Sequence, residues 1–435
     1  MRPATSATSA TSSRSGAYVG LLFAAYVVLQ RVAVPGTPIS LLLPLTVAWV
    51  AMGVRRGLVT LDRTRTLLWL AAVVATAAAS VLQTMVGSMP IASLSSWGLL
   101  LASWAPLVAT VRERDPEQFR VFLRWASTVA AVFAVLCLAT TLTQALGLAY
   151  TDVVARIVPS PALLEGFNTN SATAYGESSY KANGWLGLEP SLASLELGVG
   201  LVAALLARRR VPVVLLIAAG MLCTLSGSGL VLVVVALVGM LCSRLRSLLL
   251  RFVLPAAAAL GALALSSFGS SFIERAGEFS TPGSSGSIRG VEPYTQVIPL
   301  WVSHLDGLLL GFGPGSSQAF VNAPGIPGLI VPVPLKVFVD YGLVAGFVLA
   351  FFMVACHLGA PSRSLALALF VAYFSIQPMA TLMVLVGQIG MFAAFWSPRP
   401  GRALESLGVG AAAVAVPAPR APLTVPARSG GRHVA

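Results

Sequence analysis

Long apolar runs follow one another along almost the whole chain, and many approach or exceed the ~18 residues that are typical of a membrane-spanning helix. Charged residues make up 10% and hydrophobic residues 57% of the sequence, whereas roughly 25% of a soluble domain is charged. The length of 435 residues alone would fit several soluble domains, but this composition does not. The sequence therefore predicts an all-α polytopic membrane protein.

Twelve segments are predicted to be transmembrane helices. They are residues 17–34, 38–54, 67–85, 91–111, 125–148, 190–207, 211–226, 229–243, 252–268, 334–358, 364–380 and 381–397. The apolar stretch 211–243 is too long for one span of about 20 residues, and SGSG at Ser226–Gly229 supplies a turn in its middle. The transmembrane domain, residues 17–397, is flanked by two tails that are predicted to be disordered, residues 1–16 and 398–435.

Basic residues are distributed unevenly among the predicted connections. If the N-terminus is cytoplasmic and the spans alternate, 22 of the 28 Lys and Arg residues fall on the cytoplasmic side, one falls inside the first span and five fall outside. The one inside the first span is Arg31, and the five outside are Arg156, Lys181, Arg275, Arg289 and Lys336. This bias matches the positive-inside rule. It predicts a multi-pass plasma (inner) membrane protein with both termini cytoplasmic, and it explains the net charge of +13 without a nucleic-acid partner.

Two predicted outer segments are long, residues 149–189 and 269–333, whereas the other connections are short. Long connections that persist in a compact protein usually carry function. The second contains YTQVIPLWVSHLDG, whose first half predicts an amphipathic helix on the membrane surface. We therefore expect functional residues in these two segments.

Acidic residues lie at or near the outer ends of two predicted spans. Glu189 precedes Pro190 at the start of a span, and an acid followed by proline is typical of a helix N-terminus. Alternatively, Glu189 is a carboxylate at the rim of a membrane cavity that accepts a proton from a sugar hydroxyl. Glu196 lies deeper in the same helix, where an ionisable group indicates function or bundle packing. Asp340 lies near the start of a late span.

The outer cations each have two interpretations. Arg289 could bind phosphate with two parallel N–H groups, or it could form a surface ion pair with Glu292. Arg275 lies between two glutamates, which favours a solvated ion pair. Lys181 could contact phosphate or be an ordinary loop lysine. Lys336, at the start of an apolar run, could extend its ammonium group to the membrane interface.

The glycine-rich sequence GFGPGS, Gly311–Ser316, offers backbone N–H groups that could bind an anion. Gly313, Gly315 and Ser316 are therefore candidate substrate-binding residues, although a glycine–proline sequence is often a plain turn. The nucleotide-binding pattern G-x-x-x-x-G-K-[S/T] does not occur in the sequence. Nothing in the sequence therefore suggests ATP hydrolysis.

Three parts of the chain together resemble the O-antigen polymerase and O-antigen ligase superfamily. NGWLGLEPSLASLELGVG is similar to the family's G-x-x-x-EP start of a span, and LCTLSGSGLVLVVVAL is similar to its T-x-S-R-S-G break. SIRGVEPYTQVIPLWVSHLDGLLLGFGPGS, followed by VFVDYGLVAGFVLAFF, resembles its succession of arginine, amphipathic helix, G-x-G-x-G-S and E/D-x-G-L. The resemblance runs from Asn183 to Phe352.

The resemblance implies a C-type glycosyltransferase fold that acts on an undecaprenyl-pyrophosphate-linked glycan in the lipid bilayer. It implies no metal and no other cofactor, because the leaving group is already activated. Arg289 falls on the family's arginine, which would stabilise the pyrophosphate, and Glu189 falls on the EP position. Arg275 and Lys181 are expected to assist in substrate binding. A flippase and a chain-length regulator are candidate protein partners.

Two departures from the family pattern bear on the type of enzyme. Gly227 stands where the family has the arginine of S-R-S-G. The ligase branch carries a histidine in the second outer segment close to the following span, whereas no histidine occurs here between His304 and His357. His304, on the amphipathic segment, is a candidate substrate-binding residue. These departures favour a polymerase that joins lipid-linked repeat units. The alternatives are a ligase that moves finished glycan to another acceptor, and a transporter of lipid-linked sugar or another solute.

Overall fold

The computed structural model describes residues 14–86, 93–173, 179–242, 285–317, 331–376 and 380–397, and these residues are mostly helical. The longer helices are α1 (Arg14–Leu29), α2 (Leu42–Arg55), α3 (Arg63–Val86), α4 (Leu94–Trp104), α5 (Pro116–Ala145), α7 (Pro190–Leu206), α8 (Val211–Cys223), α9 (Ser228–Leu241), α14 (Glu292–Val302), α17 (Val333–Ala355), α18 (Arg363–Ile376) and α19 (Met383–Phe392). The short elements are β1 (Val59–Leu61), η1 (Ala105–Val108), β2 (Ala109–Val111), α6 (Val153–Ile157), η2 (Ser160–Ala162), α13 (Ser285–Gly290), α15 (Leu305–Leu310) and η4 (Ala394–Trp396).

Three of the described helices, α3, α5 and α17, are long and apolar enough to cross a membrane. The other apolar helices of the described residues are 10–17 residues long. A helix overlaps every predicted span that falls among the described residues, and the predicted span 252–268 lies outside them. The helical class and the presence of membrane-compatible helices are therefore confirmed, while the number of spans stays a prediction.

The helix α5 starts earlier than the sequence pattern predicted, at Pro116 instead of residue 125. Asp115 is its N-cap, and the Asp115 carboxylate accepts a hydrogen bond of 3.2 Å from the N–H of Glu117. Proline suits the first helical position because its missing N–H would have no helical partner there. The helix therefore begins on a polar Asp-Pro-Glu signal ahead of the apolar run.

The predicted span 91–111 does not stay helical to its end. Helix α4 ends at Trp104, and Pro106, which has no backbone N–H, lies in the 3-10 turn that follows. The chain then becomes the strand β2, which pairs antiparallel with β1 and places Val59 opposite Val111. This small sheet joins the connection between α2 and α3 to the connection between α4 and α5.

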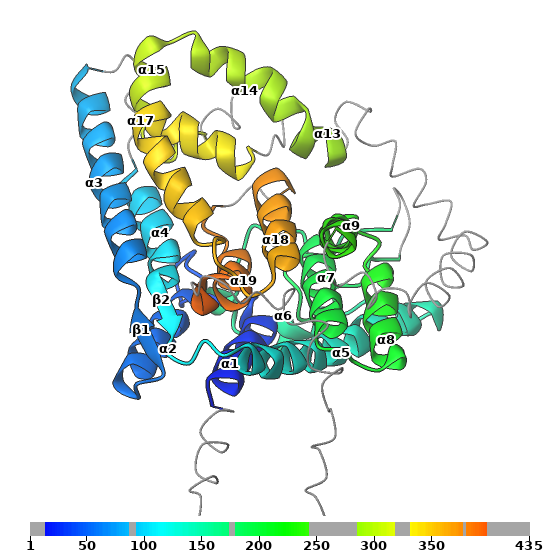
Figure 1. Ribbon diagram of the computed structural model, residues 1–435. Coiled ribbons are helices and arrows are strands. Elements are labelled where there is room, and N and C mark those ends of the chain that lie inside the picture. The colour runs from blue at the N-terminus through cyan, green and yellow to red at the C-terminus, as the bar shows by residue number, and fades with distance from the viewer. Residues whose placement is uncertain are drawn as a thin grey trace, which may run out of the picture.

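Helix α7 is the central element of the bundle. Every residue of α7 except Ser191 is buried, and the helix packs against α5, α8 and α9. A helix whose residues are apolar on nearly all sides is stable in such a position, and its buried Ser194 and Glu196 have hydrogen-bond partners within the protein. Figure 1 shows α5 and α1 along the bottom of the bundle and α3 beside α17 at its left edge.

The predicted turn between the two short helices is present between α8 and α9, and it contacts α7 closely. The Ser194 hydroxyl of α7 accepts a hydrogen bond from the N–H of Gly229 (3.2 Å) and donates one to the carbonyl of Ser226 (3.0 Å). A Cβ atom at Gly229 would lie 2.1 Å from the Ser194 carbonyl oxygen. Glycine is therefore required at this position for α7 and α9 to pack.

Helices α13, α14 and α15 form an arch across the top of the molecule in Figure 1, above α17, α18 and α9. Helix α14 buries Pro293, Val297 and Trp301, which are four residues apart and share one face. The predicted amphipathic helix is therefore present. Val297 and Trp301 pack with Phe312 and with Leu335 and Val339 of α17, in a hydrophobic cluster separate from the main core. We call this group the arch cluster.

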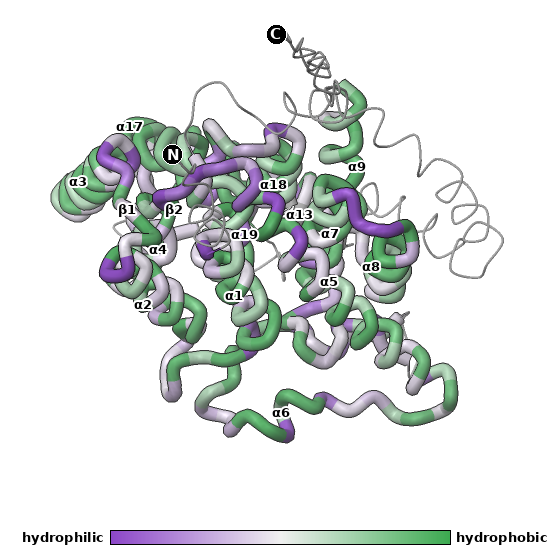
Figure 2. Tube along the Cα trace, turned by 60° about the horizontal axis from the view of Figure 1, so that its bottom comes forward, coloured by the Kyte–Doolittle hydropathy of each residue, from purple (hydrophilic) through white to green (hydrophobic). Residues whose placement is uncertain are grey.

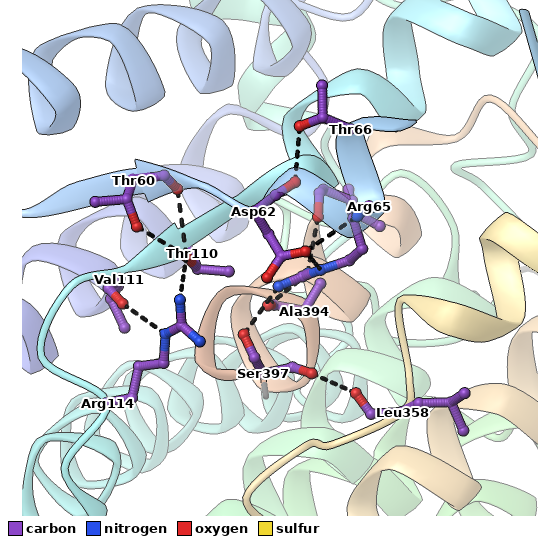
Figure 3. Close-up of polar contacts among 11 residues, drawn as sticks. Thr60, Asp62, Arg65, Thr66, Thr110, Val111, Arg114, Leu358, Ala394 and Ser397 are labelled. Atoms are coloured by element: carbon purple, nitrogen blue, oxygen red, sulfur yellow. Dashed lines mark hydrogen bonds and ion pairs between the residues drawn. The ribbon is translucent and has the colours of Figure 1, made fainter. Parts of the chain in front are cut away.

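Arg65 at the start of α3 joins three parts of the chain that are distant in sequence. Its guanidinium donates hydrogen bonds to the carbonyl oxygens of Leu107 (2.9 Å), Ala394 (2.7 Å) and Ser397 (2.9 Å). Figure 3 shows this group beside the β1–β2 pair, with Asp62 4.0 Å from the Arg65 Nε atom. Arg65 is therefore a buried structural residue that fixes the turn η4 to α3.

Hydrophobic residues cover most of each helix, and short hydrophilic stretches lie at the connections (Figure 2). One of them, Arg208–Arg210, joins α7 to α8. This arrangement is the one expected for helices that lie in a membrane and connections that lie in water.

Candidate functional site

Glu189 is the N-cap residue of α7, but its side chain makes no capping hydrogen bond to the helix. Instead, one carboxylate oxygen accepts a hydrogen bond from the N–H of Asn168 (3.2 Å), and the other accepts one from the Ser191 hydroxyl (2.9 Å). Both donors are neutral. Among the described residues, no cation lies within ion-pair distance of Glu189. The carboxylate is therefore half-buried, oriented by the first outer segment and not neutralised by a described partner.

The turn that leads into Glu189 is organised by the buried side chain of Asn183. Its amide oxygen accepts hydrogen bonds from the N–H of Trp185 (3.0 Å) and the hydroxyl of Tyr150 (3.1 Å). Its amide nitrogen donates to the carbonyls of Thr169 (3.2 Å) and Gly187 (3.3 Å). All four hydrogen-bonding positions of the Asn183 amide are used, so the turn has one defined conformation.

Gln30, directly after α1, holds the residue before Glu189. Its amide oxygen accepts a hydrogen bond of 3.2 Å from the N–H of Leu188. Its amide nitrogen donates to the Glu196 carboxylate and to the carbonyl of Val27, both at 3.0 Å. Glu196 is 2% exposed and lies in the middle of α7, so Gln30 also supplies a hydrogen bond to this buried acid.

Arg31 connects the end of α1 to the first outer segment. Its two terminal nitrogens each lie 2.6 Å from one carboxylate oxygen of Asp152, and one of them also donates to the carbonyl of Trp185 at 3.2 Å. Burial acts to raise the pKa of Asp152, but the hydrogen bonds from Arg31 and from the N–H of Ala155 outweigh it and hold that pKa below its ordinary value. Planar, two-point pairs of this kind are strong and directional.

The sequence pattern did not identify Gln30, Arg31 or Asp152 as site residues. Arg31 was expected inside the first span, whereas α1 ends at Leu29 and leaves Arg31 at the end of the helix. Arg31 and Asp152 are 121 residues apart, so no local pattern joins them. The available signal was the position of a polar pair, Gln30–Arg31, at the end of an apolar run.

The glycine-rich loop directs its donors to Asp340. This buried carboxylate accepts hydrogen bonds from the N–H groups of Gly315 (3.2 Å) and Ser317 (2.8 Å) and from the Ser316 hydroxyl (3.0 Å). The Lys336 ammonium donates to it at 3.0 Å and to the Ser317 hydroxyl at 2.8 Å. The anion that these groups bind in the structure is thus the side chain of Asp340. Lys336 thus forms a partly buried ion pair with Asp340, and its position relative to the membrane interface stays a prediction.

Two glycines allow this loop to contact α17. Gly342 interrupts the helix with φ 69° and ψ −177°, and Gly311 has φ 78°. A Cβ atom at Gly311 would lie 2.5 Å from the Asp340 carbonyl oxygen, and one at Gly342 would lie 2.3 Å from the carbonyl oxygen of Leu309. Positive φ angles and this close approach both require glycine. Gly313 also has a positive φ, 96°, and its N–H donates to the carbonyl of Asp340 at 3.0 Å.

The remaining predicted residues lie on or near the two outer segments. Arg289 lies in α13, which packs against α18, and the proposed ion-pair partner Glu292 accepts a hydrogen bond of 2.8 Å from Ser287. His304 is the N-cap residue of α15, and its Nδ1 atom lies 3.0 Å from the Ser303 hydroxyl. The N–H of Lys181 donates to the carbonyl of Ser171 at 2.9 Å. Arg275 lies outside the described residues.

The structure thus places four of the predicted residues in two separate groups of contacts. Glu189 belongs to the group around the start of α7, while Gly313, Gly315 and Ser316 belong to the group around Asp340. Helix α7 packs on α9, α9 packs on α18, and α18 contacts α13, which carries Arg289. In the described ranges, no group of three His, Cys, Asp or Glu side chains is arranged to hold a metal ion.

These residues belong to a mostly helical chain with three described helices that are long and apolar enough to cross a membrane. No protein-family model and no curated protein sequence matches the chain.

Proposed function

We propose that the protein is a membrane glycosyltransferase that polymerises undecaprenyl-pyrophosphate-linked oligosaccharide units at the outer face of the plasma membrane. The observation that supports this proposal is the set of contacts made by the Glu189 carboxylate. It is held by two neutral donors at the start of a buried helix, with no ion-pair partner among the described residues. Such a carboxylate can accept a proton from a hydroxyl group that is placed next to it.

In the proposed reaction, the hydroxyl oxygen of the acceptor sugar attacks the anomeric carbon of the donor glycan. Its proton moves to Glu189. The bond between the anomeric carbon and the pyrophosphate oxygen breaks, and the electron pair leaves with undecaprenyl pyrophosphate. Positive charge near the leaving group stabilises the developing negative charge, and we assign this role to Arg289, with Arg275 and Lys181 in supporting contacts.

The proposal requires Glu189 and Arg289 to act on the same substrate. In the contact series α7–α9–α18–α13, two helices lie between the helix that follows Glu189 and the helix that carries Arg289. The proposal includes the C-type glycosyltransferase class, about twelve spans and two cytoplasmic termini. His304 and the glycine-rich loop lie at the other end of the arch from α13 (Figure 1). In this proposal His304 contributes to substrate binding, whereas the N–H groups of Gly315 and Ser317 are taken up by Asp340.

The test replaces Glu189 by Gln and Arg289 by Ala in cells that lack the native gene, and measures the length of the exported polymer. Glu117→Gln and Arg120→Ala are matched controls, because these two residues form a partly exposed ion pair of 3.1 Å at the start of α5. We expect single lipid-linked units in the two site variants and normal polymer in the controls. Full-length polymer from Arg289→Ala would reject the proposed role of Arg289.

The product that accumulates in the deletion strain distinguishes the polymerase from its alternatives. Loss of a polymerase leaves single lipid-linked units, whereas loss of a ligase leaves long lipid-linked polymer. Loss of a transporter leaves units on the cytoplasmic side of the membrane. Either of the last two results would contradict the proposed reaction.

A further inference from the structure

Gln30 and Arg31 are consecutive residues, and both contact the chain directly before Glu189. Gln30 accepts a hydrogen bond from the N–H of Leu188, and Arg31 donates one to the carbonyl of Trp185. These backbone groups lie one and four residues before Glu189. Trp185 itself has a positive φ of 59°, which is unfavourable for a side chain of this size. Contacts from outside the turn therefore add to those of Asn183 in keeping its conformation.

Both side chains are themselves fixed. Gln30 is 0% and Arg31 5% exposed. The remaining hydrogen-bonding groups of Gln30 are taken by Glu196 and Val27, and Arg31 is held by both oxygens of Asp152. A polar side chain that is buried and held on several sides can transmit a defined position to its partner, because a change of rotamer would break its hydrogen bonds.

We propose that Gln30 and Arg31 are positioning residues, which set the location of the Glu189 carboxylate through the backbone of residues 185–188. This inference deepens the proposed function and rests on it for its effect on catalysis. Its structural part is independent, because it concerns where Glu189 lies and not what Glu189 does.

The structural part is tested by chemical labelling. Glu189→Cys is introduced, and its rate of modification by a membrane-impermeant maleimide is compared with the background rate of the parent chain. We expect a change of about fivefold or more when Gln30→Leu or Arg31→Lys is added, since lysine cannot make the two-point contact with Asp152 and also reach Trp185. Equal labelling rates in all backgrounds would overturn the proposal.

Two controls separate positioning from a general loss of stability. Gln83→Leu replaces another buried glutamine, whose amide atoms have no hydrogen-bond partner among the described residues, and should leave the labelling rate of residue 189 unchanged. Glu196→Gln changes the second partner of Gln30 but keeps the contact with Leu188. A change in labelling with Glu196→Gln as large as that with Gln30→Leu would contradict the proposal, because it would assign the effect to the buried acid.

The catalytic part is tested by the rate of polymer formation with purified, folded variants and the native Glu189. Gln30→Leu is expected to lower kcat by about ten- to a hundredfold with little change in KM, as a small displacement of a catalytic group does. Arg31→Lys should retain more activity than Arg31→Met. If the wild-type protein forms no polymer, the proposed function fails and the labelling result still decides the positioning role. If the wild-type protein does form polymer and the kcat of Gln30→Leu equals that of Gln83→Leu, the positioning role is rejected.

Discussion

Lys336 and Asp340 are one turn apart on α17, and the lysine ammonium lies 3.0 Å from a carboxylate oxygen of the aspartate. The Asp340 side chain is 2% and the Lys336 side chain 20% exposed. The same carboxylate accepts the N–H groups of Gly315 and Ser317. This one side chain therefore connects α17 to the glycine-rich loop at the end of the arch.

Replacement of Asp340 by Ala should lower the free energy of unfolding by about 3 kcal/mol, because it leaves a partly buried ammonium and two N–H groups without their acceptor. Glu117→Ala is the control, since the ion pair of Glu117 with Arg120 is also within one helical turn but its acid is 49% exposed. An exposed pair contributes about 0–1 kcal/mol. Equilibrium unfolding in detergent micelles measures both. Equal losses in the two variants would show that Asp340 does not hold the loop.

Acid should weaken the contact between Arg31 and Asp152. Because the folded-state pKa of Asp152 lies below its ordinary value, the stabilisation is complete above the unfolded pKa of about 3.9 and is lost as pH falls through the lower folded pKa. The difference in thermal midpoint between wild type and Asp152→Asn should therefore shrink from pH 6 to pH 3. Exposed Glu113, replaced by Gln, serves as the control. A difference that stays constant over this range would argue against the ion pair.

Two glycines of the turn between α8 and α9 should respond differently to alanine. A Cβ atom at Gly229 would meet the Ser194 carbonyl oxygen at 2.1 Å, whereas one at Gly227 would meet nothing within 4 Å. Gly227 also has helical angles, φ −75° and ψ −16°. Gly229→Ala should lower the free energy of unfolding by about 1–3 kcal/mol, and Gly227→Ala should be neutral or stabilising by up to about 1 kcal/mol. Similar unfolding midpoints would contradict the close packing of α7 and α9.

Labelling from outside the cell should reach the first outer segment and not the connection after α2. Asn170→Cys and Arg56→Cys place thiols at two exposed positions. On the orientation derived from the basic residues, a membrane-impermeant maleimide modifies residue 170 in intact cells and residue 56 only after permeabilisation. The parent chain, with its four cysteines, gives the background. The reverse pattern would remove the proposed outer site.

Helix positions could be predicted from the sequence where an apolar run begins directly at a polar signal. The sequence LEPS predicted that a helix starts at residue 190, and α7 starts at Pro190. The apolar pattern alone predicts a start for α5 that is too late, because the Asp-Pro-Glu signal at Asp115 lies ahead of the apolar run. The strand β2 could not be found locally, because three residues become a strand only when β1, about fifty residues earlier in the chain, lies beside them.

The candidate site was predicted in part. The position of Glu189 at the start of α7 followed from the sequence, but its partners did not, because the N–H of Asn168 is a backbone group in an irregular segment. The loop around Gly313 was expected to bind an external anion. Nothing in its local sequence indicates that Asp340, which follows some twenty-five residues after it, supplies the negative charge. The hydrogen-bond partners of these residues are therefore set by contacts between residues far apart in the sequence, which local patterns do not indicate.

The arch cluster has a consequence for how such a chain can diverge. Because Val297 and Trp301 of α14 pack with Phe312 and α17 apart from the main core, residues of α14 can change without repacking that core. Chimeras that exchange Glu292–Val302 with the same segment of another chain should therefore stay folded when positions 312, 335 and 339 are exchanged with it. The outer surface of this helix can in this way vary while the bundle beneath it keeps its packing.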